Sequence, residues 1–335
     1  MALFFNEEFC RHVQTSFHPE SPERLKGIIQ KLKLHGLWSD VVSSTGGCED
    51  RLKLIHDEEY IGLLRDGGNF NLTMDTFVHP ETYEIAALSA KCGVDAVEHS
   101  KKEESASFAL TRPPGHHAGS DYGMGFCYFN NIAIAAEGLL RGGDHRIAIV
   151  DPDVHHGNGT EHIFTDRADV LYISTHQMGI FPGTGSVDFL GTGEGEGFTI
   201  NIPFPSGSGD STYLAALSRL VVPIVSQFDP DAILVSLGTD GHYRDPLASL
   251  SLSSVGYLEY AKGLITLSEG CRKRITFFLE GGYDVPALSE VVASIVGAFK
   301  GVETPLEFTD AGDDECVGMA AIERCSRNAS KYWRL

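Results

Sequence analysis

The sequence predicts a single α/β domain in which a parallel sheet lies between layers of helices. Short apolar runs alternate along the chain with longer segments of helical periodicity, the order typical of parallel sheets with covering helices. Most of these runs are continuous rather than alternating, as in strands buried on both faces. No internal repeat and no Pro/Ser-rich linker divides residues 1–335, so one domain is expected.

The expected strands are short runs rich in β-branched and aromatic residues. They are Ala2–Phe5, Ser107–Leu110, Arg146–Val150, Val170–Ser174, Thr199–Pro203, Ala232–Leu237 and Ile275–Leu279. The helical patterns between them often begin at proline and end near glycine, as helices do. They are Pro22–His35, Pro80–His99, Asn130–Leu140, Ser211–Phe228, Val255–Glu269 and Pro286–Gly297. Residues 302–335 are expected to form a C-terminal tail and helix.

The charge balance limits the kind of partner. The chain carries 26 Lys+Arg against 46 Asp+Glu, which gives a net charge of −20. Nucleic acid is not expected as a partner, because phosphate binding needs a basic surface. An acidic surface instead raises the local concentration of cationic molecules.

The sequence also predicts where the chain resides. Its start, Met1–Glu8, has neither the basic nor the apolar region of a signal peptide, and no run reaches the length of a membrane helix. The seven cysteines are scattered without a C-x-x-C pair, so neither a disulfide framework nor a cysteine metal site is expected. We therefore expect no membrane partner and a cytoplasmic protein, with the nucleus open for a eukaryotic source.

Reactive side chains follow several of the expected strands directly. These segments are residues 112–119, 151–160, 238–247 and 280–283. In open α/β sheets, ligands bind at the carboxyl ends of the strands. The sequence therefore predicts one functional site at this edge, with its motifs between residues 112 and 283.

Asp153 and His155 form the first candidate pair of metal ligands. In an extended chain residues two apart point the same way, so both side chains can share one face. Asp240 is the best candidate for a third ligand, and three protein ligands leave a position for water, as in catalytic zinc sites. The alternative is a capped turn between strand and helix, in which Asp153 accepts backbone N–H groups. The polar ends of the other strands favour the metal site.

His116, His117 and Tyr283 are the candidates for proton transfer and charge stabilisation. The adjacent histidines would diverge on a regular strand, but the preceding Pro113-Pro-Gly sequence indicates a loop that could turn both toward one pocket. Two imidazoles offer a general base and a general acid, and a phenol can stabilise a developing oxyanion. Taken alone, the histidines would be ordinary loop residues and the tyrosine a packed turn residue.

Six motifs in order resemble the histone deacetylase family. They are RPPGHHA, GFCYFNN, DPDVHHGNGT, FPGTGS, Asp240-Gly-His-Tyr-Arg-Asp-Pro-Leu247 and LEGGYD. The likeness runs from about His18 through the helix after Tyr283, and is strongest to the class II branch and to bacterial histone-deacetylase-like and acetylpolyamine amidohydrolases. It implies a single-domain three-layer α/β/α arginase-deacetylase fold and the hydrolysis of an N-acyl amide.

The resemblance also implies a role for each residue of the site. Asp153, His155 and Asp240 would bind one catalytic zinc ion. His117 would move the proton, with His116 mainly an electrostatic partner. Asp151 would hydrogen-bond to His116, Asn158 would support His117, and Tyr283 would polarise the scissile carbonyl.

The family further implies a substrate tunnel and a structural potassium ion. Gly125, Phe126 and Phe181 match the tunnel walls. The potassium ion would bind backbone oxygens of Asp151, Asp153 and His155 together with Ser174 and Thr175. A second potassium ion would lie around Phe164, Arg167 and Val170. Pro152 departs from the family pattern, because a bulky apolar residue is usual there, and it could perturb the first potassium loop.

Leu247 bears on the choice of substrate. A polyamine-specialised branch of the family has an acidic residue at this position, so a neutral leucine favours acyl-lysine in proteins or peptides. An acetylated polyamine stays open because of the acidic net charge. Two further alternatives are a manganese ureohydrolase of the related arginase fold, which needs a second Asp cluster, and a non-catalytic acyl-lysine binding module.

Overall fold

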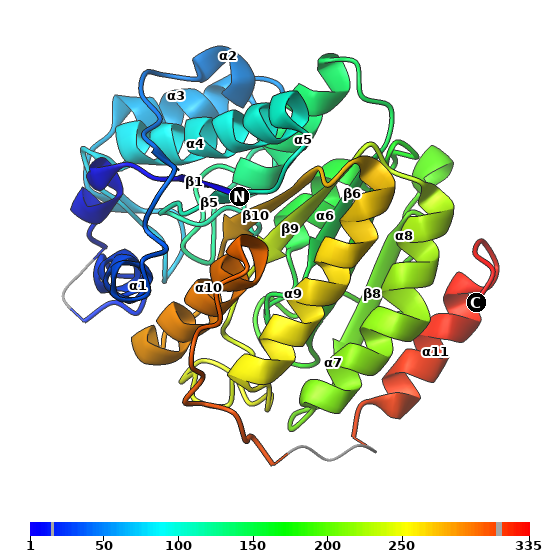
Figure 1. The fold of residues 1–335 in the computed structure, drawn as a ribbon. Helices are drawn as coiled ribbons and strands as arrows, with labels where there is room; N and C mark the ends of the chain where they lie inside the picture. The colour runs from blue at the N-terminus through cyan, green and yellow to red at the C-terminus, as the bar shows by residue number, and fades with distance from the viewer. Residues whose placement is uncertain (15–16, 313–316) are drawn as a thin grey trace.

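A parallel sheet forms the centre of the computed structural model, which describes residues 1–14, 17–312 and 317–335 (Figure 1). The sheet has eight strands in the order β2-β1-β5-β10-β9-β6-β7-β8, and all of its pairings are parallel. The strands are β1 (Ala2–Phe4), β2 (Val41–Val42), β5 (Ser107–Ala109), β6 (Ile147–Asp151), β7 (Val170–Gln177), β8 (Thr199–Phe204), β9 (Ala232–Leu237) and β10 (Ile275–Leu279). A separate antiparallel pair is formed by β3 (Phe70–Asn71) and β4 (Phe77–Val78).

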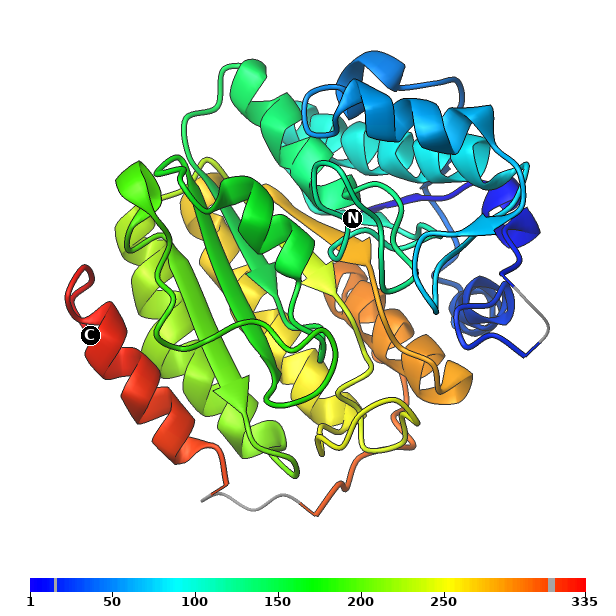
Figure 2. The ribbon, with the colours of Figure 1, turned by 180° about the vertical axis from the view of Figure 1, so that it is seen from behind.

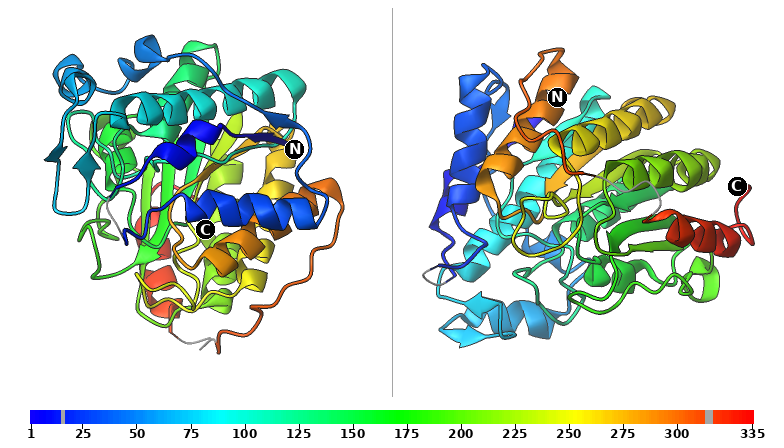
Figure 3. Two further views of the ribbon diagram at one scale, coloured as in Figure 1. Left: turned by 90° about the vertical axis from the view of Figure 1, so that its left-hand side faces the viewer. Right: turned by 90° about the horizontal axis from the view of Figure 1, so that it is seen from below.

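Helices cover both faces of this sheet, as the views from behind and from below show (Figures 2 and 3). One face carries α1 (Glu23–Leu34), α7 (Asp210–Ala216), α8 (Val222–Phe228), α9 (Ser254–Ser268) and α10 (Val285–Lys300). The other carries α2 (Glu49–Leu52), α3 (Glu58–Asp66), α4 (Thr82–Glu103), α5 (Asn131–Arg141) and α6 (Asn158–Phe164). Helix α11 (Met319–Ala329), within the expected C-terminal tail, packs against β8 and α7. The fold class predicted from the sequence is confirmed.

The structure differs from the sequence predictions in its short elements. The expected strands and helices are all present, with ends shifted by a few residues. The two-residue strands β2, β3 and β4 and the short helices α2, α3 and α6 were not predicted, because so few residues carry no detectable periodicity. The expected helix Ser211–Phe228 contains a π-helical turn over Leu217–Val221. This turn directly precedes α8, whose second residue is Pro223, and the missing N–H of a proline could not be accommodated in an α-helix interior without a break.

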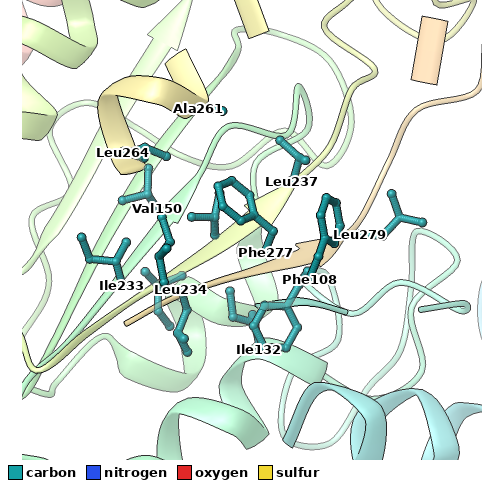
Figure 4. Close-up of a cluster of buried hydrophobic side chains, with 14 of the residues drawn as sticks. Phe108, Ile132, Val150, Ile233, Leu234, Leu237, Ala261, Leu264, Phe277 and Leu279 are labelled. Carbon is teal, nitrogen blue, oxygen red and sulfur yellow. The ribbon is translucent and has the colours of Figure 1, made fainter. Parts of the chain in front are cut away.

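The core lies between the central strands and the helices on both faces. Phe108 of β5 and Phe277 of β10 pack with their ring centroids 5.7 Å apart, and Val150, Leu234 and Ile132 belong to the same buried cluster (Figure 4). Because β6, β9 and β10 are neighbours that run the same way, their carboxyl ends meet at one edge. No helix among the described residues is long and apolar enough to cross a membrane.

Candidate active site

Asp153, His155 and Asp240 come together at the carboxyl ends of β6 and β9. Each offers one ligand atom, and these atoms all lie within 4.8 Å of one another. Nδ1 of His155 is 3.0 Å from Oδ2 of Asp240 and 3.5 Å from Oδ1 of Asp153. Both carboxylates are fully buried. The structure therefore gathers the residues of the predicted triad around one point.

The surroundings of the triad suit a divalent cation. A Cβ atom on Gly238 would overlap Oδ2 of Asp153, and one on Gly281 would overlap Oδ2 of Asp240, so the glycines leave room for the carboxylates. Burial would lower the pKa of His155, but the two carboxylates outweigh it and raise the pKa to about 10. The site thus attracts positive charge, and two carboxylates with one imidazole are donors that zinc accepts.

Asp153 also accepts hydrogen bonds from backbone N–H groups, as expected for the alternative of a capped turn. Its Oδ1 accepts a hydrogen bond from His155 N (2.9 Å), and its Oδ2 accepts one from Gly281 N (2.8 Å). However, Gly157 is the N-cap residue of α6, and no side chain caps this helix. The aspartate is therefore not a helix cap, and its backbone contacts fix the carboxylate toward Asp240 and His155.

His116 and His117 lie side by side, with ring centroids 4.0 Å apart. Nδ1 of His116 lies 3.1 Å from Oδ2 of Asp151, and Nδ1 of His117 lies 2.8 Å from Oδ1 of Asn158. Nε2 of His116 is 3.8 Å from Oδ1 of Asp153, next to the triad. The loop therefore brings both imidazoles to the site, each paired with the partner that the family resemblance implied.

Opposite electrostatic environments separate the two histidines. Burial acts to lower the pKa of both. For His116 the carboxylates of Asp153 and Asp151 outweigh burial and hold the pKa well above its usual value. For His117 the neighbouring His116 and His155 add to burial and hold the pKa well below it. At neutral pH His117 is thus available as a base beside a protonated His116.

Tyr283 lies in the loop after β10, two residues beyond Gly281, whose N–H donates to Oδ2 of Asp153 (2.8 Å). Its ring makes an edge contact with Phe126 at 5.8 Å between centroids. The guanidinium carbon of Arg24 lies 5.1 Å from the centre of the same ring. Burial holds the pKa of the phenol well above its usual value. The charge of Arg24 acts to lower this pKa, and the charge of Asp240 acts to raise it. The hydroxyl therefore keeps its proton and can donate a hydrogen bond.

Two aromatic rings pack against these groups, one beside His117 and one beside Tyr283. Phe181 packs edge-on against His117 at 5.1 Å between ring centroids, while Phe126 packs against Tyr283. Gly125, at φ +55°, leaves no space for a side chain, because a Cβ atom there would lie 2.5 Å from Cδ2 of His117. Phe181 and Leu247 are each 39% exposed. These positions suit the walls and rim of a passage for an extended chain.

The comparisons with known proteins agree with this geometry. Residues 18–299 match the histone deacetylase domain. The chain belongs to the histone deacetylase family. A probable deacetylase of Archaeoglobus fulgidus is 39% identical, over 99% of this chain and 98% of that protein. Histone deacetylase 14, chloroplastic, of Arabidopsis thaliana is 38% identical, over 86% of this chain and 74% of that protein.

A solved histone deacetylase structure extends the comparison from sequence to fold. The HDA15 HD domain superposes with a TM-score of 0.91 and is 30% identical, covering 99% of this chain and 97% of that one. Together these findings confirm the family and the fold that the sequence motifs predicted.

The histone deacetylase resemblance also implied potassium ligands, and their positions are compatible with such a site. Asp151 and Ser174 face each other in register between β6 and β7. Thr175 follows Ser174 on β7 and is buried. Oγ of Ser174 lies 2.9 Å from Nδ1 of His176. Potassium binding stays a prediction.

Sequence reasoning missed several residues that hold this deacetylase site together. Glu280 accepts hydrogen bonds from Gly115 N (2.8 Å) and His116 N (3.3 Å), and so fixes the histidine loop. Asp245 turns its carboxylate to backbone N–H groups of the Tyr283 loop, rather than forming the second Asp cluster of a ureohydrolase. Glu280 stands in the LEGGYD motif and Asp245 in the Asp-Pro-Leu motif, so the motifs were the available signal.

Proposed function

We propose that this protein is a zinc-dependent deacetylase that removes acetyl or other acyl groups from the ε-amine of lysine in peptides or proteins. The observation that carries the proposal is the Asp153/His155/Asp240 triad with the histidine pair beside it, together with the packing of Phe181 on His117 and of Phe126 on Tyr283. We propose the same residues as the site of the reaction, and residues 1–335 as one domain. The cytoplasmic location expected from the sequence stays a prediction.

Asp153, His155 and Asp240 would hold the zinc ion. When bound, zinc lowers the pKa of a water molecule and polarises a carbonyl group. Three protein ligands fit a catalytic site, because one coordination position is left for water or substrate. We also propose a structural potassium ion held by Asp151, Asp153 and His155 backbone oxygens with Ser174 and Thr175.

The two histidines would have different roles, with His117 transferring protons and His116 stabilising charge. His117, neutral because its pKa is held low, takes the proton of the attacking water and later delivers it to the amine that leaves. Asn158 holds its ring in place through Nδ1. His116, hydrogen-bonded through Nδ1 to Asp151, would stabilise the negative charge that develops nearby.

Tyr283 would donate its hydroxyl proton to the oxygen of the scissile carbonyl as that oxygen becomes negative. Removing one such donor typically costs about 100- to 1,000-fold in kcat. We therefore expect Tyr283→Phe to lower kcat by about this factor while the metal content stays unchanged. Metal analysis and turnover of the same preparation test this, and turnover at the rate of the unmodified protein would remove the tyrosine from the mechanism.

The rim of the pocket favours a neutral substrate chain over a polycation. Leu247 is apolar and 39% exposed. Two carboxylates of the neighbouring loops already have partners. Asp284 forms an ion pair with Arg244 (3.2 Å), and Asp245 accepts backbone N–H groups. A polyamine needs an unpaired carboxylate to bind its remaining ammonium groups, whereas an acyl-lysine side chain needs an apolar passage.

Paired turnover measurements test the substrate. The zinc-loaded protein is given an acetyl-lysine peptide and N8-acetylspermidine, and kcat/KM is compared. A preference for the peptide of about tenfold or more, equivalent to 1.4 kcal/mol, supports the proposal. The reverse preference would establish the alternative, an acetylpolyamine deacetylase. No turnover of any acyl-lysine peptide by protein that binds it and contains metal would support the non-catalytic binding module.

Matched variants at the rim sharpen this test. Leu247→Glu introduces the negative charge that the polyamine-specialised branch carries, whereas Leu247→Gln gives a similar volume without charge. We expect only Leu247→Glu to improve kcat/KM for acetylspermidine, by up to about fivefold, because an exposed charge pair contributes up to ~1 kcal/mol. Equal effects of both substitutions would show that size, rather than charge, governs the rim.

A further inference from the structure

Asp245 joins the two loops that border the pocket. Its side chain is buried, and its oxygens point to backbone N–H groups rather than to the triad. Oδ2 accepts hydrogen bonds from Tyr283 N (2.6 Å) and Asp284 N (3.2 Å), and Oδ1 accepts one from Leu247 N (3.0 Å). The carboxylate of Asp245 thus fixes the backbone of both Tyr283 and Leu247.

The other contacts of Tyr283 act on different parts of the residue. Arg24 lies over the ring and donates from Nε to the oxygen of Gly282 (2.7 Å), while Phe126 contacts the ring edge. Gly282, at φ +119°, is in a conformation that glycine adopts readily and other residues rarely do. Two features therefore fix the backbone position of Tyr283, from which its ring extends. They are the conformation of Gly282 and the hydrogen bond from Tyr283 N to Asp245.

We propose that Asp245 is a positioning residue for deacetylation. It sets the position of the Tyr283 hydroxyl relative to the scissile carbonyl and, through the same carboxylate, holds Leu247 at the rim. This inference rests on the proposed function of the site. A carboxylate suits the task because both of its oxygens accept hydrogen bonds, whereas an amide has one accepting oxygen and presents donors on the other side.

The first test is Asp245→Asn, measured with an acetyl-lysine peptide. One of the two loops must then face an amide NH₂ group, so its backbone N–H loses its acceptor. We expect kcat to fall about 30-fold, less than the loss of the phenol itself, and KM to rise by up to about threefold. The metal content and the melting temperature should stay close to those of the unmodified protein.

Asp284→Asn is the matched control. This substitution removes the same charge from the neighbouring residue, and asparagine still caps α10, where Asp284 accepts from Ala287 N (3.0 Å). We expect kcat to change by no more than about twofold. A loss equal to that of Asp245→Asn would show that local charge is responsible, and would overturn the positioning role.

A double-mutant cycle separates positioning from general destabilisation. If Asp245 acts through the phenol, Asp245→Asn should cost less than about threefold in a Tyr283→Phe background, because the group that it positions is already gone. An undiminished 30-fold penalty there would overturn the proposal. A trifluoroacetyl-lysine peptide gives a second readout, since its activated carbonyl needs less help from the hydroxyl: Asp245→Asn should lose less than about fivefold on it.

A further variant covers the case in which Asp245→Asn folds poorly. Asp245→Glu keeps both accepting oxygens but moves them by one methylene group, and should show the same fall in kcat and the same dependence on Tyr283. Normal kcat in either folded variant would overturn the inference while leaving the deacetylase proposal intact. A lack of turnover in the unmodified protein, with every acyl-lysine peptide tested, would instead overturn the proposed function.

Discussion

Two buried clusters of charged side chains lie close together in this protein, and they differ in how their charges are balanced. The catalytic cluster contains Asp153, Asp240 and His155 with the neighbouring Asp151 and Glu280, and its carboxylates outnumber its cationic groups. The Glu20 cluster, formed by Glu20, Arg24 and Arg112, has none of its side chains exposed to solvent. It lies directly behind Tyr283, which Arg24 contacts.

The charged groups of the Glu20 cluster find their partners within the chain. Arg112 donates to both oxygens of Glu20, including a bond of 2.8 Å from Nη2 to Oε2, and to the backbone oxygens of Phe9 (2.7 Å) and His12 (3.0 Å). Arg24 donates to the backbone oxygens of Gly282 and Glu280. Buried ions persist when their remaining hydrogen-bonding groups are satisfied in this way.

The pairing of buried charges within the chain distinguishes a structural cluster from a functional one. Buried charges are costly unless they are paired. The Glu20 cluster meets this requirement with arginine, whereas the catalytic cluster leaves negative charge that a bound cation would balance.

Removing a ligand from the catalytic cluster should have the largest effect. Asp240→Asn takes away one of two carboxylates of the triad and should lower turnover by about 1,000-fold or more, because the metal supplies several kcal/mol of stabilisation to the transition state. The purified variant should also contain less zinc. Full zinc content and full activity in this variant would contradict the proposal that the carboxylates of the catalytic cluster hold the metal ion.

Removing the carboxylate of the Glu20 cluster should affect folding instead. Glu20→Gln leaves Arg112 without its ion-pair partner, and breaking a buried pair costs about 3–5 kcal/mol in the free energy of unfolding. Denaturant titration measures this loss, and the zinc content of the folded variant should be normal. Asp188→Asn, which breaks an exposed pair with Arg324, serves as control and should cost less than ~1 kcal/mol.

The two clusters should respond to pH in opposite directions in the metal-free protein. Burial would raise the pKa of Glu20, but Arg112 outweighs it and lowers the pKa from 4.5 to about 2. The stabilisation from this group is therefore present above pH 4.5 and lost as the pH falls toward 2. Burial raises the pKa of Glu280 to about 7, so stability falls as the pH rises from 4.5 to 7.

Each of these shifts amounts to about 3 kcal/mol at 1.36 kcal/mol per pKa unit. Denaturant titrations of metal-free protein between pH 3 and 8 should therefore show a stability maximum near pH 5. Zinc should reduce the loss on the neutral side, because a cation favours the charged carboxylates. Metal-free stability that keeps rising from pH 5 to 7 would contradict the charge imbalance of the catalytic cluster.

The smallest expected effect concerns the wall of the pocket. Phe181→Ala should raise KM for an acetyl-lysine peptide by about threefold to tenfold and leave kcat within about threefold, because the ring contributes apolar contact to bound substrate and transition state alike. Met178→Ala, on the same segment and 60% exposed, is the control and should leave KM unchanged. A large fall in kcat would instead mean that Phe181 orients His117.

The sequence by itself was sufficient for the fold class and for the candidates of the site. Continuous apolar runs such as Ala232–Leu237 and Ile275–Leu279 coincide with β9 and β10, because strands buried on both faces leave a clear pattern. The motifs after these strands identified the triad, the histidine pair and Tyr283 as candidates, since the carboxyl ends of parallel strands share one edge.

The hydrogen bonds that orient these groups, and the environments that set their pKa values, depend on the tertiary structure. Adjacent residues such as His116 and His117 have no preferred common direction in sequence, and their shared orientation depends on the loop that Glu280 fixes from 164 residues away. Asp245 and Tyr283 are separated by 38 residues, and Arg24 and Glu280 by 256. Such contacts depend on the packing of distant segments and on burial, which local periodicity does not encode.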